Sequence, residues 1–251
     1  MKPPERVYFF GTCLIDMLYP KAGLAGMQLL RQAGIKVIYP KDQTCCGQPA
    51  FNSGYRDEAL SVARSLIKCF PQNIPVVVPS GSCAGMIKQH WAELFADQVD
   101  AEAAAEIASR TYELTQFLVD VLDLKLKDLG KPVKIAVHTS CSARREMGVA
   151  EHIESLLGQL DAVELVQQER KAECCGFGGT FAIKQADISG AMVQDKTTSL
   201  RATGAERVIS QDCGCLMNIG GAFDKQAQDK GKGPVTQHIA EFLWERTHAS
   251  N

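Results

Sequence analysis

The tripeptide Cys-Cys-Gly occurs twice in this chain of 251 residues, at positions 45–47 and 174–176. Four cysteines of the first half recur in the second at a nearly constant offset, which pairs Cys13 with Cys141, Cys45 with Cys174, Cys46 with Cys175, and Cys83 with Cys213. Spacings this constant indicate an internal duplication. We therefore expect two halves with the same fold, each carrying the same set of thiols.

The segments around the cysteines also correspond. Apolar runs precede both Cys13 and Cys141, and each half closes on a similar helical stretch, 113–122 in the first and 238–247 in the second. A charged segment around 124–134, which contains glycine and proline, is typical of a linker. The expected domains are residues 1–123 and 133–251.

Within each half the pattern alternates between strand and helix. In the first half, apolar runs at 6–10, 36–39 and 75–79 predict strands, and amphipathic stretches at 18–33 and 55–69 predict helices. Unbroken apolar strands joined by helices are typical of a parallel sheet covered by helices. The expected fold class is α/β, with two pseudo-symmetric halves, each a small, mostly parallel sheet flanked by helices.

The cysteines of the first half each follow one of its three predicted strands. Cys13 comes after the first strand, Cys45 and Cys46 after the second, and Cys83 after the third. The carboxyl ends of parallel strands meet at one edge of a sheet, where open α/β folds bind their ligands. We therefore expect the four sulfurs to converge there.

Four thiols at one edge suit a soft metal centre, either a tetrahedral zinc site or an iron–sulfur cluster. Adjacent cysteines reach one ion only with strain, whereas a cluster offers several iron atoms to neighbouring sulfurs. Gly47 and Gly176 would allow the positive-φ turn, or the close backbone approach, that lets both sulfurs face the cofactor. The predicted ligands are Cys13, Cys45, Cys46, Cys83, Cys141, Cys174, Cys175 and Cys213.

Composition narrows the class of protein. With 45% hydrophobic and 22% charged residues and a net charge of −2, the chain can bury a sizeable core but offers no basic field for nucleic acid. No apolar run approaches the roughly 20 residues of a membrane-spanning helix. Ten cysteines without a signal peptide favour a reducing compartment, so a cytoplasmic location is expected.

The spacings Cys-x31-Cys-Cys-Gly-x35-Cys and Cys-x32-Cys-Cys-Gly-x36-Cys resemble the cysteine-rich CCG domain. That domain occurs in one of the subunits of heterodisulfide reductase, in the glycolate oxidase iron–sulfur subunit and in lactate-utilization proteins. Two bare domains without a ferredoxin-type C-x₂-C-x₂-C run are most similar to the lactate-utilization branch. The resemblance implies an iron–sulfur electron-transfer subunit of a multi-protein L-lactate oxidation system. Its implied partners are other subunits, including a ferredoxin-type iron–sulfur protein, with peripheral association with the respiratory chain.

The chain departs from the fuller motif of this family, which ends in Cys-x-x-Cys. The first of those two cysteines is replaced by Ser80 in one half and Ser210 in the other. Four sulfurs per half would fit one [4Fe–4S] cluster each. Cys215 is an additional thiol of the second half, able to act as a substitute ligand or as a redox-exposed neighbour.

Two other functions remain open. One is a Cys₄ zinc site, in one or both halves, that stabilises a docking subunit. The other is a thiol–disulfide oxidoreductase, disfavoured because no C-x-x-C motif stands beside a helix start. No flavin or nicotinamide fingerprint is evident, so the carbon chemistry is assigned to a partner or to the assembled complex.

Several further residues have ordinary structural interpretations. Cys69 is expected in the core and His138 as a satisfied polar neighbour, although a hydrogen bond from His138 to a cluster sulfur would tune its potential. Arg144 and Arg145 are expected to be solvated helix charges. The run 176–179, rich in glycine, favours close backbone packing over a phosphate cradle.

Overall fold

The computed structural model of the chain describes residues 3–248. Its first half contains β1 (Arg6–Phe9), α1 (Cys13–Leu18), α2 (Pro20–Gln32), β2 (Lys36–Ile38), α3 (Gln48–Asn52), α4 (Arg56–Ile67), β3 (Val76–Val78), α5 (Gly81–Gly85), the π-helix η1 (Met86–His90), α6 (Trp91–Leu94), α7 (Ala101–Ser109), β4 (Thr111–Glu113), α8 (Leu114–Gln116) and the π-helix η2 (Phe117–Val121). Its second half contains β5 (Val133–Val137), α9 (Cys141–Arg145), α10 (Ala150–Leu157), β6 (Val163–Val166), α11 (Phe181–Lys184), α12 (Ala186–Ala202), β7 (Arg207–Ser210), α13 (Cys213–Lys230), β8 (Val235–His238) and α14 (Ile239–Thr247).

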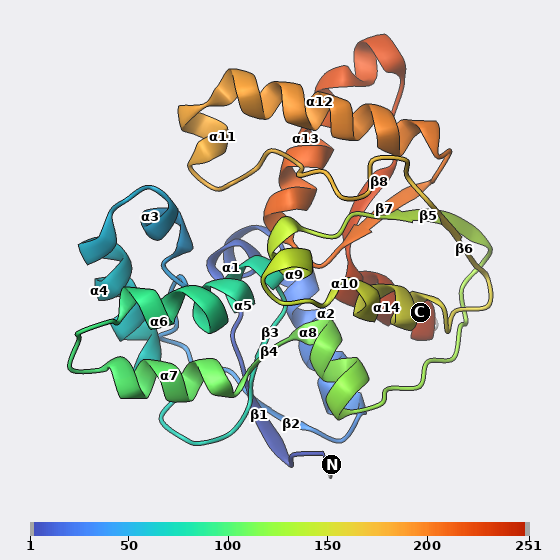
Figure 1. Cartoon of the computed structure of the whole chain (residues 1–251). Helices are drawn as coiled ribbons and strands as arrows, with labels where there is room; N and C mark the ends of the chain where they lie inside the picture. The colour runs from blue at the N-terminus through green and yellow to red at the C-terminus, as the bar shows by residue number, and fades with distance from the viewer. Residues whose placement is uncertain (1–2, 249–251) are drawn as a thin grey trace.

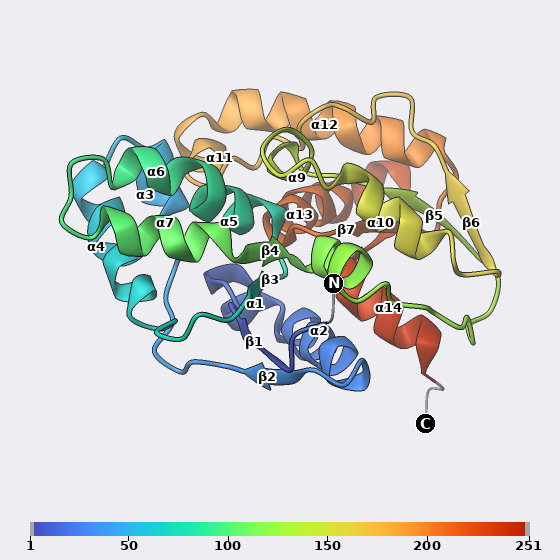
Figure 2. The same ribbon diagram turned by 60° about the horizontal axis from the view of Figure 1, so that its bottom comes forward.

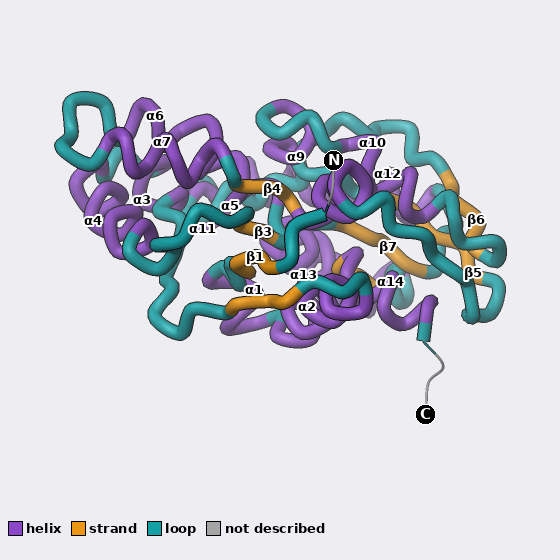
Figure 3. Tube along the Cα trace, turned by 90° about the horizontal axis from the view of Figure 1, so that it is seen from below, coloured by secondary structure: helices purple, strands orange, loops and turns teal. Residues whose placement is uncertain are grey.

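Each half contains one four-stranded sheet in which all strands are parallel. The strand orders are β2-β1-β3-β4 and β6-β5-β7-β8, so the two sheets have the same topology. Figure 3 shows them as two separate groups of strands. The predicted fold class, an α/β protein of two similar halves with parallel sheets, is confirmed.

Two details differ from the sequence-based expectation. The fourth strand of each half, β4 or β8, was missed because a strand of three or four residues precedes the helix without a visible change of pattern. The helix predicted at 18–33 is present as α2, which begins at Pro20, but the short helix α1 before it was not predicted. Proline starts a helix readily because it has no N–H to donate to the preceding turn.

The two sheets share one apolar core. Val7 and Phe9 of β1 face this core, whereas Tyr8 and Phe10, which alternate with them, face a second cluster under α4 and α7. Ile135 and Val137 of β5 enter the same shared core from the other half. The halves are therefore joined through buried apolar surface.

The closing helices of each half pack on the other half and fill the space between the sheets. Helix α14, which ends the second half, packs on α2 of the first, and α8 with η2, which end the first half, packs on α10 of the second. Figures 1 and 2 show these four helical segments meeting in the middle of the molecule. The arrangement is reciprocal, as expected for a pseudo-two-fold relation between the repeats.

The segment between the halves is fastened by a shielded ion pair. Asp128 accepts hydrogen bonds from Arg246 Nε at 2.8 Å and Arg246 Nη2 at 2.6 Å, and the two side chains are only 3% and 5% exposed. Burial opposes ionisation of Asp128, but these bonds and those from the backbone N–H groups of Gly130 and Ala162 outweigh it and keep its pKa below the usual value.

Among residues 3–248, no helix is both long enough and apolar enough to cross a bilayer.

We expect Asp128→Asn to lower the free energy of unfolding by about 3 kcal/mol, because it leaves a shielded guanidinium without its anionic partner. Urea unfolding at pH 7 measures this loss. The depressed pKa means that the stabilisation is complete above about pH 4 and disappears as pH falls through the folded-state pKa. The two proteins should therefore converge in acid.

Asp123→Asn provides the matched control. Asp123 pairs with Lys125 at 2.6 Å, but the two side chains are 82% and 76% exposed, so its loss should change stability by less than about 1 kcal/mol. Equal losses for the two variants would contradict the role given to the Asp128–Arg246 pair.

Candidate metal site

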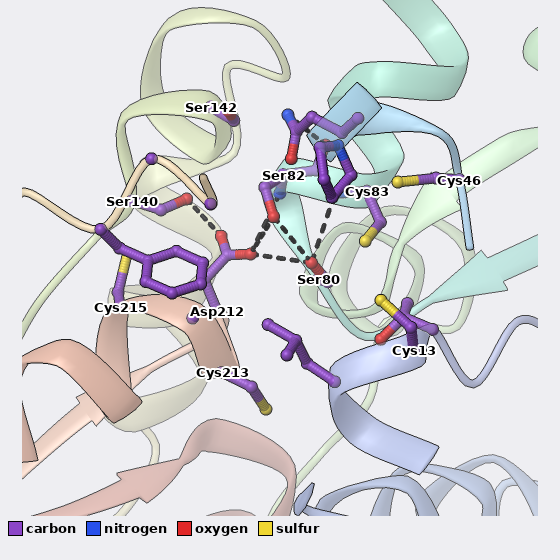
Figure 4. Close-up of a pocket in the computed structure, with 18 of the residues that line it drawn as sticks. Cys13, Cys46, Ser80, Ser82, Cys83, Ser140, Ser142, Asp212, Cys213 and Cys215 are labelled. Atoms are coloured by element: carbon purple, nitrogen blue, oxygen red, sulfur yellow. Dashed lines mark hydrogen bonds between the residues drawn. The ribbon is translucent and has the colours of Figure 1, made fainter. Parts of the chain in front are cut away.

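Cysteines from both halves line one cavity of about 200 Å³. The cavity lies where the carboxyl ends of the strands meet the helices that follow them, and Figure 4 shows several of its side chains. The expected convergence of sulfurs is therefore confirmed, but the two separate sites expected from the sequence are joined in one space. The cysteines that line it are Cys13, Cys45, Cys46, Cys83, Cys141, Cys174, Cys175, Cys213 and Cys215.

Both Cys-Cys-Gly turns depend on their glycine. Gly47 has a φ of 91° and Gly176 a φ of 81°, so both adopt the left-handed conformation expected from the sequence. A Cβ on Gly47 would lie 3.0 Å from the carbonyl oxygen of Ala59, and one on Gly176 would lie 2.8 Å from that of Ser189. The turns are thus pressed against the helices α4 and α12, which leaves both sulfurs of each pair at the cavity.

In the first half, the four thiols interact with one another. Cys13 Sγ donates to Cys45 Sγ across 3.7 Å, and this contact raises the pKa of Cys13 and lowers that of Cys45. Neighbouring Cys45 and Cys83, together with burial, raise the pKa of Cys46. Four sulfurs from three strand ends therefore line the same side of the cavity, a donor set whose softness suits thiophilic metals and clusters.

The second half repeats this arrangement with a different fourth sulfur. Contact with Cys174 is the main reason that the pKa of Cys141 is raised, and the amide of Gly176 donates to Cys174 Sγ at 3.4 Å. Cys175 interacts with Cys215, and the ligand atoms of His138, Cys175 and Cys215 all lie within 4.8 Å of one another. Cys213 is not a member of that group.

The strand register explains why the fourth sulfur is Cys215. Phe9 pairs with Val77 in the first sheet, and Val137, the counterpart of Phe9, pairs with Ile209 in the second. The offset that takes Val77 to Ile209 also takes Cys83 to Cys215. The expected pairing of Cys83 with Cys213 was therefore wrong, because the cysteines were matched out of register with the strands.

Cys213 instead lies at the boundary with the first half. Burial is the main reason that its pKa is raised, and the charges that contribute include Glu241 and, from the other half, Cys83. The pKa of Tyr19, in the first half, is raised mainly by burial and, to a smaller extent, by the charge of Cys213. Figure 4 shows its sulfur directed away from Cys215.

The same register makes Asp212, not Ser210, the counterpart of Ser80. Ser80 caps α5 by accepting from the amide of Cys83, and Asp212 stands at the equivalent position before α13. Ser210 is the buried last residue of β7. Aligning the two strands before the two cysteines would have revealed Asp212, a residue that the sequence interpretation overlooked.

Asp212 joins the halves between the two groups of thiols. Its carboxylate accepts from Ser80 Oγ at 2.7 Å, from Ser82 Oγ at 2.7 Å and from the Ser82 amide at 3.1 Å, all in the first half. The hydroxyl of Ser140, in the second half, donates to its other oxygen (Figure 4). Four donors compensate a carboxylate that is only 3% exposed.

His138 differs from its expected role as a satisfied neighbour. Its side chain is 1% exposed, and neither ring nitrogen has a hydrogen-bond partner among the described residues. Burial, together with the cations Lys196 and Arg144, lowers the pKa of His138 to about 3, so the ring is neutral at pH 7. A buried imidazole with a free donor and a free acceptor beside two sulfurs is suited to a metal or a cluster.

The remaining candidates have structural roles. Cys69 donates to the Ser65 carbonyl at 3.4 Å and packs against the outer core of the first half, away from the cavity. Arg144 donates to the carbonyls of Lys171 and Ala172, which braces the segment leading to the second Cys-Cys-Gly turn. Arg145 is exposed, as expected of a solvated charge.

Two thiol-rich α/β repeats that share one cavity define a cysteine-rich protein of the two-domain type. The pattern of the CCG cysteine-rich domain matches residues 7–88 and 135–220. The chain is 46% identical to lactate utilization protein A of Shouchella clausii and 44% identical to that of a Geobacillus species, in each case over 95% of this chain and 98% of the relative. The chain therefore belongs to the CCG cysteine-rich family that includes lactate utilization protein A.

A solved structure shares the fold alone. A crystal structure of a hypothetical protein from Helicobacter pylori aligns with all of this chain at a TM-score of 0.65, with 12% sequence identity. This chain spans half the length of that structure.

The strand register predicts different roles for Cys213 and Cys215, two thiols of one helix turn. We expect Cys215→Ser to remove the metal bound by the second half, about half of the total, because it takes away the sulfur beside Cys175. Cys213→Ser should retain it. Metal analysis of the purified proteins measures both, and loss of the second-half metal only in Cys213→Ser would refute the pairing of Cys83 with Cys215.

Gly176→Ala should distort the second Cys-Cys-Gly turn, because the new Cβ meets the Ser189 carbonyl in addition to straining φ. Left-handed strain alone costs of order 1–3 kcal/mol. Gly179→Ala is the control, since Gly179 has a φ of 63° but a Cβ there would have no atom within 4 Å. Urea unfolding should show a clearly larger loss for Gly176→Ala, and equal losses would exclude a role for the close approach.

Proposed function

We propose that this chain is an iron–sulfur electron-transfer subunit of a multi-protein system that oxidises L-lactate to pyruvate. The observation that carries the proposal is the single cavity lined by cysteines of both repeats. Iron–sulfur clusters are held by groups of cysteine thiolates, and they accept and release single electrons when bound. The lactate assignment draws on the names of relatives that are 46% and 44% identical to the chain.

The donor sets fit one cluster in each repeat. Cys13, Cys45, Cys46 and Cys83 would hold the first, with Gly47 shaping the turn. The corresponding set of the second repeat, shaped by Gly176, is Cys141, Cys174, Cys175 and Cys215. Adjacent sulfurs in each Cys-Cys-Gly turn favour a body with several metal atoms over a single ion. We propose residues 1–123 and 133–251 as the two cluster-binding domains.

The cavity is poorly suited to the carbon chemistry of lactate. A hydroxy-acid substrate carries a carboxylate, which proteins bind with arginine or lysine. Among the described residues that line the cavity there is neither, and the charged group that does line it is Asp212. We therefore assign hydride or proton removal from lactate to a partner subunit and the relay of electrons to this chain.

The proposed partners follow from that division of work. A ferredoxin-type iron–sulfur protein would exchange electrons with this chain, and the system would feed the respiratory chain from the cytoplasmic side. The relatives' designation as protein A supports a system of several proteins.

One observation favours a second candidate, a zinc-stabilised docking subunit. His138, Cys175 and Cys215 present one nitrogen and two sulfurs within 4.8 Å of one another, a set that zinc accepts readily. In that case the second repeat would hold a structural ion and carry no electrons.

Anaerobic purification followed by iron and acid-labile sulfide analysis separates the two candidates. We expect about eight irons per chain, four for each of two clusters, with visible absorption. Stoichiometric zinc in a colourless protein would reject the iron–sulfur proposal. Cys46→Ser and Cys175→Ser should each remove one centre, whereas Cys69→Ser, the control outside the cavity, should keep both.

A further inference from the structure

The two repeats place different side chains around equivalent thiols. Phe10 ends the first strand of the first repeat, and His138 stands at the equivalent position of the second, since each donates its amide to the neighbouring strand at 2.9 Å. Both side chains are buried, at 0% and 1% exposure. One repeat thus offers an apolar ring where the other offers a polar one beside Cys175 and Cys215.

A second difference lies on the helix that covers each Cys-Cys-Gly turn. Gly47 approaches Ala59 of α4 and Gly176 approaches Ser189 of α12, which fixes the correspondence of the two helices. Two helical turns further on, Leu66 in the first repeat corresponds to Lys196 in the second. Both are 0% exposed, so a buried ammonium replaces a buried isobutyl group.

Lys196 is linked through hydrogen bonds to the end of β5, the strand that His138 follows. Its Nζ donates to Gln168 Oε1 at 3.0 Å and to the Arg170 carbonyl at 2.6 Å. Gln168 Nε2 in turn donates to the carbonyl of Val137, the residue before His138, at 2.6 Å. Burial lowers the pKa of Lys196, and the negative charges of Glu173 and Cys175 act against that effect.

A third difference between the repeats also adds positive charge to the second one. Arg144, half-buried on α9, occupies the position that Asp16 holds on α1. The negative charge of Asp212 has the opposite effect, because it helps to raise the pKa of Cys141 and Cys215. This carboxylate is compensated by four hydrogen bonds shared between the repeats. Glu173, which stands where the first repeat has Thr44, is paired with Arg170 at 2.5 Å, so the differences at Lys196 and Arg144 make the second repeat more positive at these two positions.

We propose that Lys196 and His138 give the second repeat's site a higher reduction potential than the first. This inference rests on the proposed iron–sulfur function. A reduced centre carries one more negative charge than the oxidised one, and a buried cation or an N–H donor close to the sulfurs stabilises that added charge. Leu66 and Phe10 supply neither, so the first site lacks this stabilisation.

Single-centre proteins make the comparison possible. In Cys46→Ser the remaining centre belongs to the second repeat, and in Cys175→Ser it belongs to the first. Potentiometric titration of each anaerobic full-length protein, followed by visible absorption and low-temperature spin resonance, gives the two potentials. We expect the higher value in Cys46→Ser.

Lys196→Met, introduced into Cys46→Ser, removes the charge and keeps most of the stem. We expect the ratio of reduced to oxidised centre at a fixed potential to fall by about tenfold, or about 59 mV for one electron. His138→Phe, which copies the first repeat, should shift the same centre in the same direction and keeps the inference testable if Lys196→Met does not fold. Lys196→Met in Cys175→Ser should leave the first centre unchanged.

The outcomes distinguish this inference from the proposed function. A colourless protein without iron overturns the proposed function and the inference with it. Iron present in both sites with equal potentials, or a second-repeat potential that neither substitution moves, overturns the inference alone. A shift confined to the second repeat supports both.

Discussion

Two parallel sheets packed on one apolar core determine the position of everything else in this protein. Val7 and Phe9 from one sheet and Ile135 and Val137 from the other enter the same interior, and the closing helix of each repeat covers the partner repeat. Because the strands of both sheets end towards the same region, their thiol-bearing turns open into a common cavity. The shared cavity is thus a product of the packing between repeats, whereas each repeat supplies its own group of thiols.

Asp212 adds a polar contact to the apolar core that joins the two repeats. A carboxylate buried between two groups of thiols would be costly without partners, and the hydroxyls of Ser80, Ser82 and Ser140 supply them from both repeats. Ser80 and Asp212 occupy equivalent positions of the duplication, so the pseudo-symmetry is broken by a hydrogen bond between two diverged copies of one residue. The same divergence separates Phe10 from His138 and Leu66 from Lys196. Duplication supplied two similar sites, and these substitutions gave them different electrostatic surroundings.

The sequence predicted much of the fold because the relevant signals are local. Apolar strand patterns, the positive-φ glycines and the placement of cysteines after strands each involve a few neighbouring residues, and Gly47 and Gly176 behave as expected. The fourth strands were missed because they are too short to show a period. Cys213 was matched with Cys83, and Cys215 was kept as an additional thiol, because counting from cysteine to cysteine hides an insertion that strand pairing exposes.

The amino-acid sequence by itself determined that this is a duplicated α/β chain with thiols gathered at the strand ends, because periodicity and spacing are properties of the chain alone. Only the tertiary structure decided that both thiol groups share one cavity, that Cys215 and His138 lie beside Cys175, and that Lys196 is buried and bonded to Gln168. Those contacts join residues far apart in the chain. They depend on how sheets, helices and repeats pack, which no local pattern encodes.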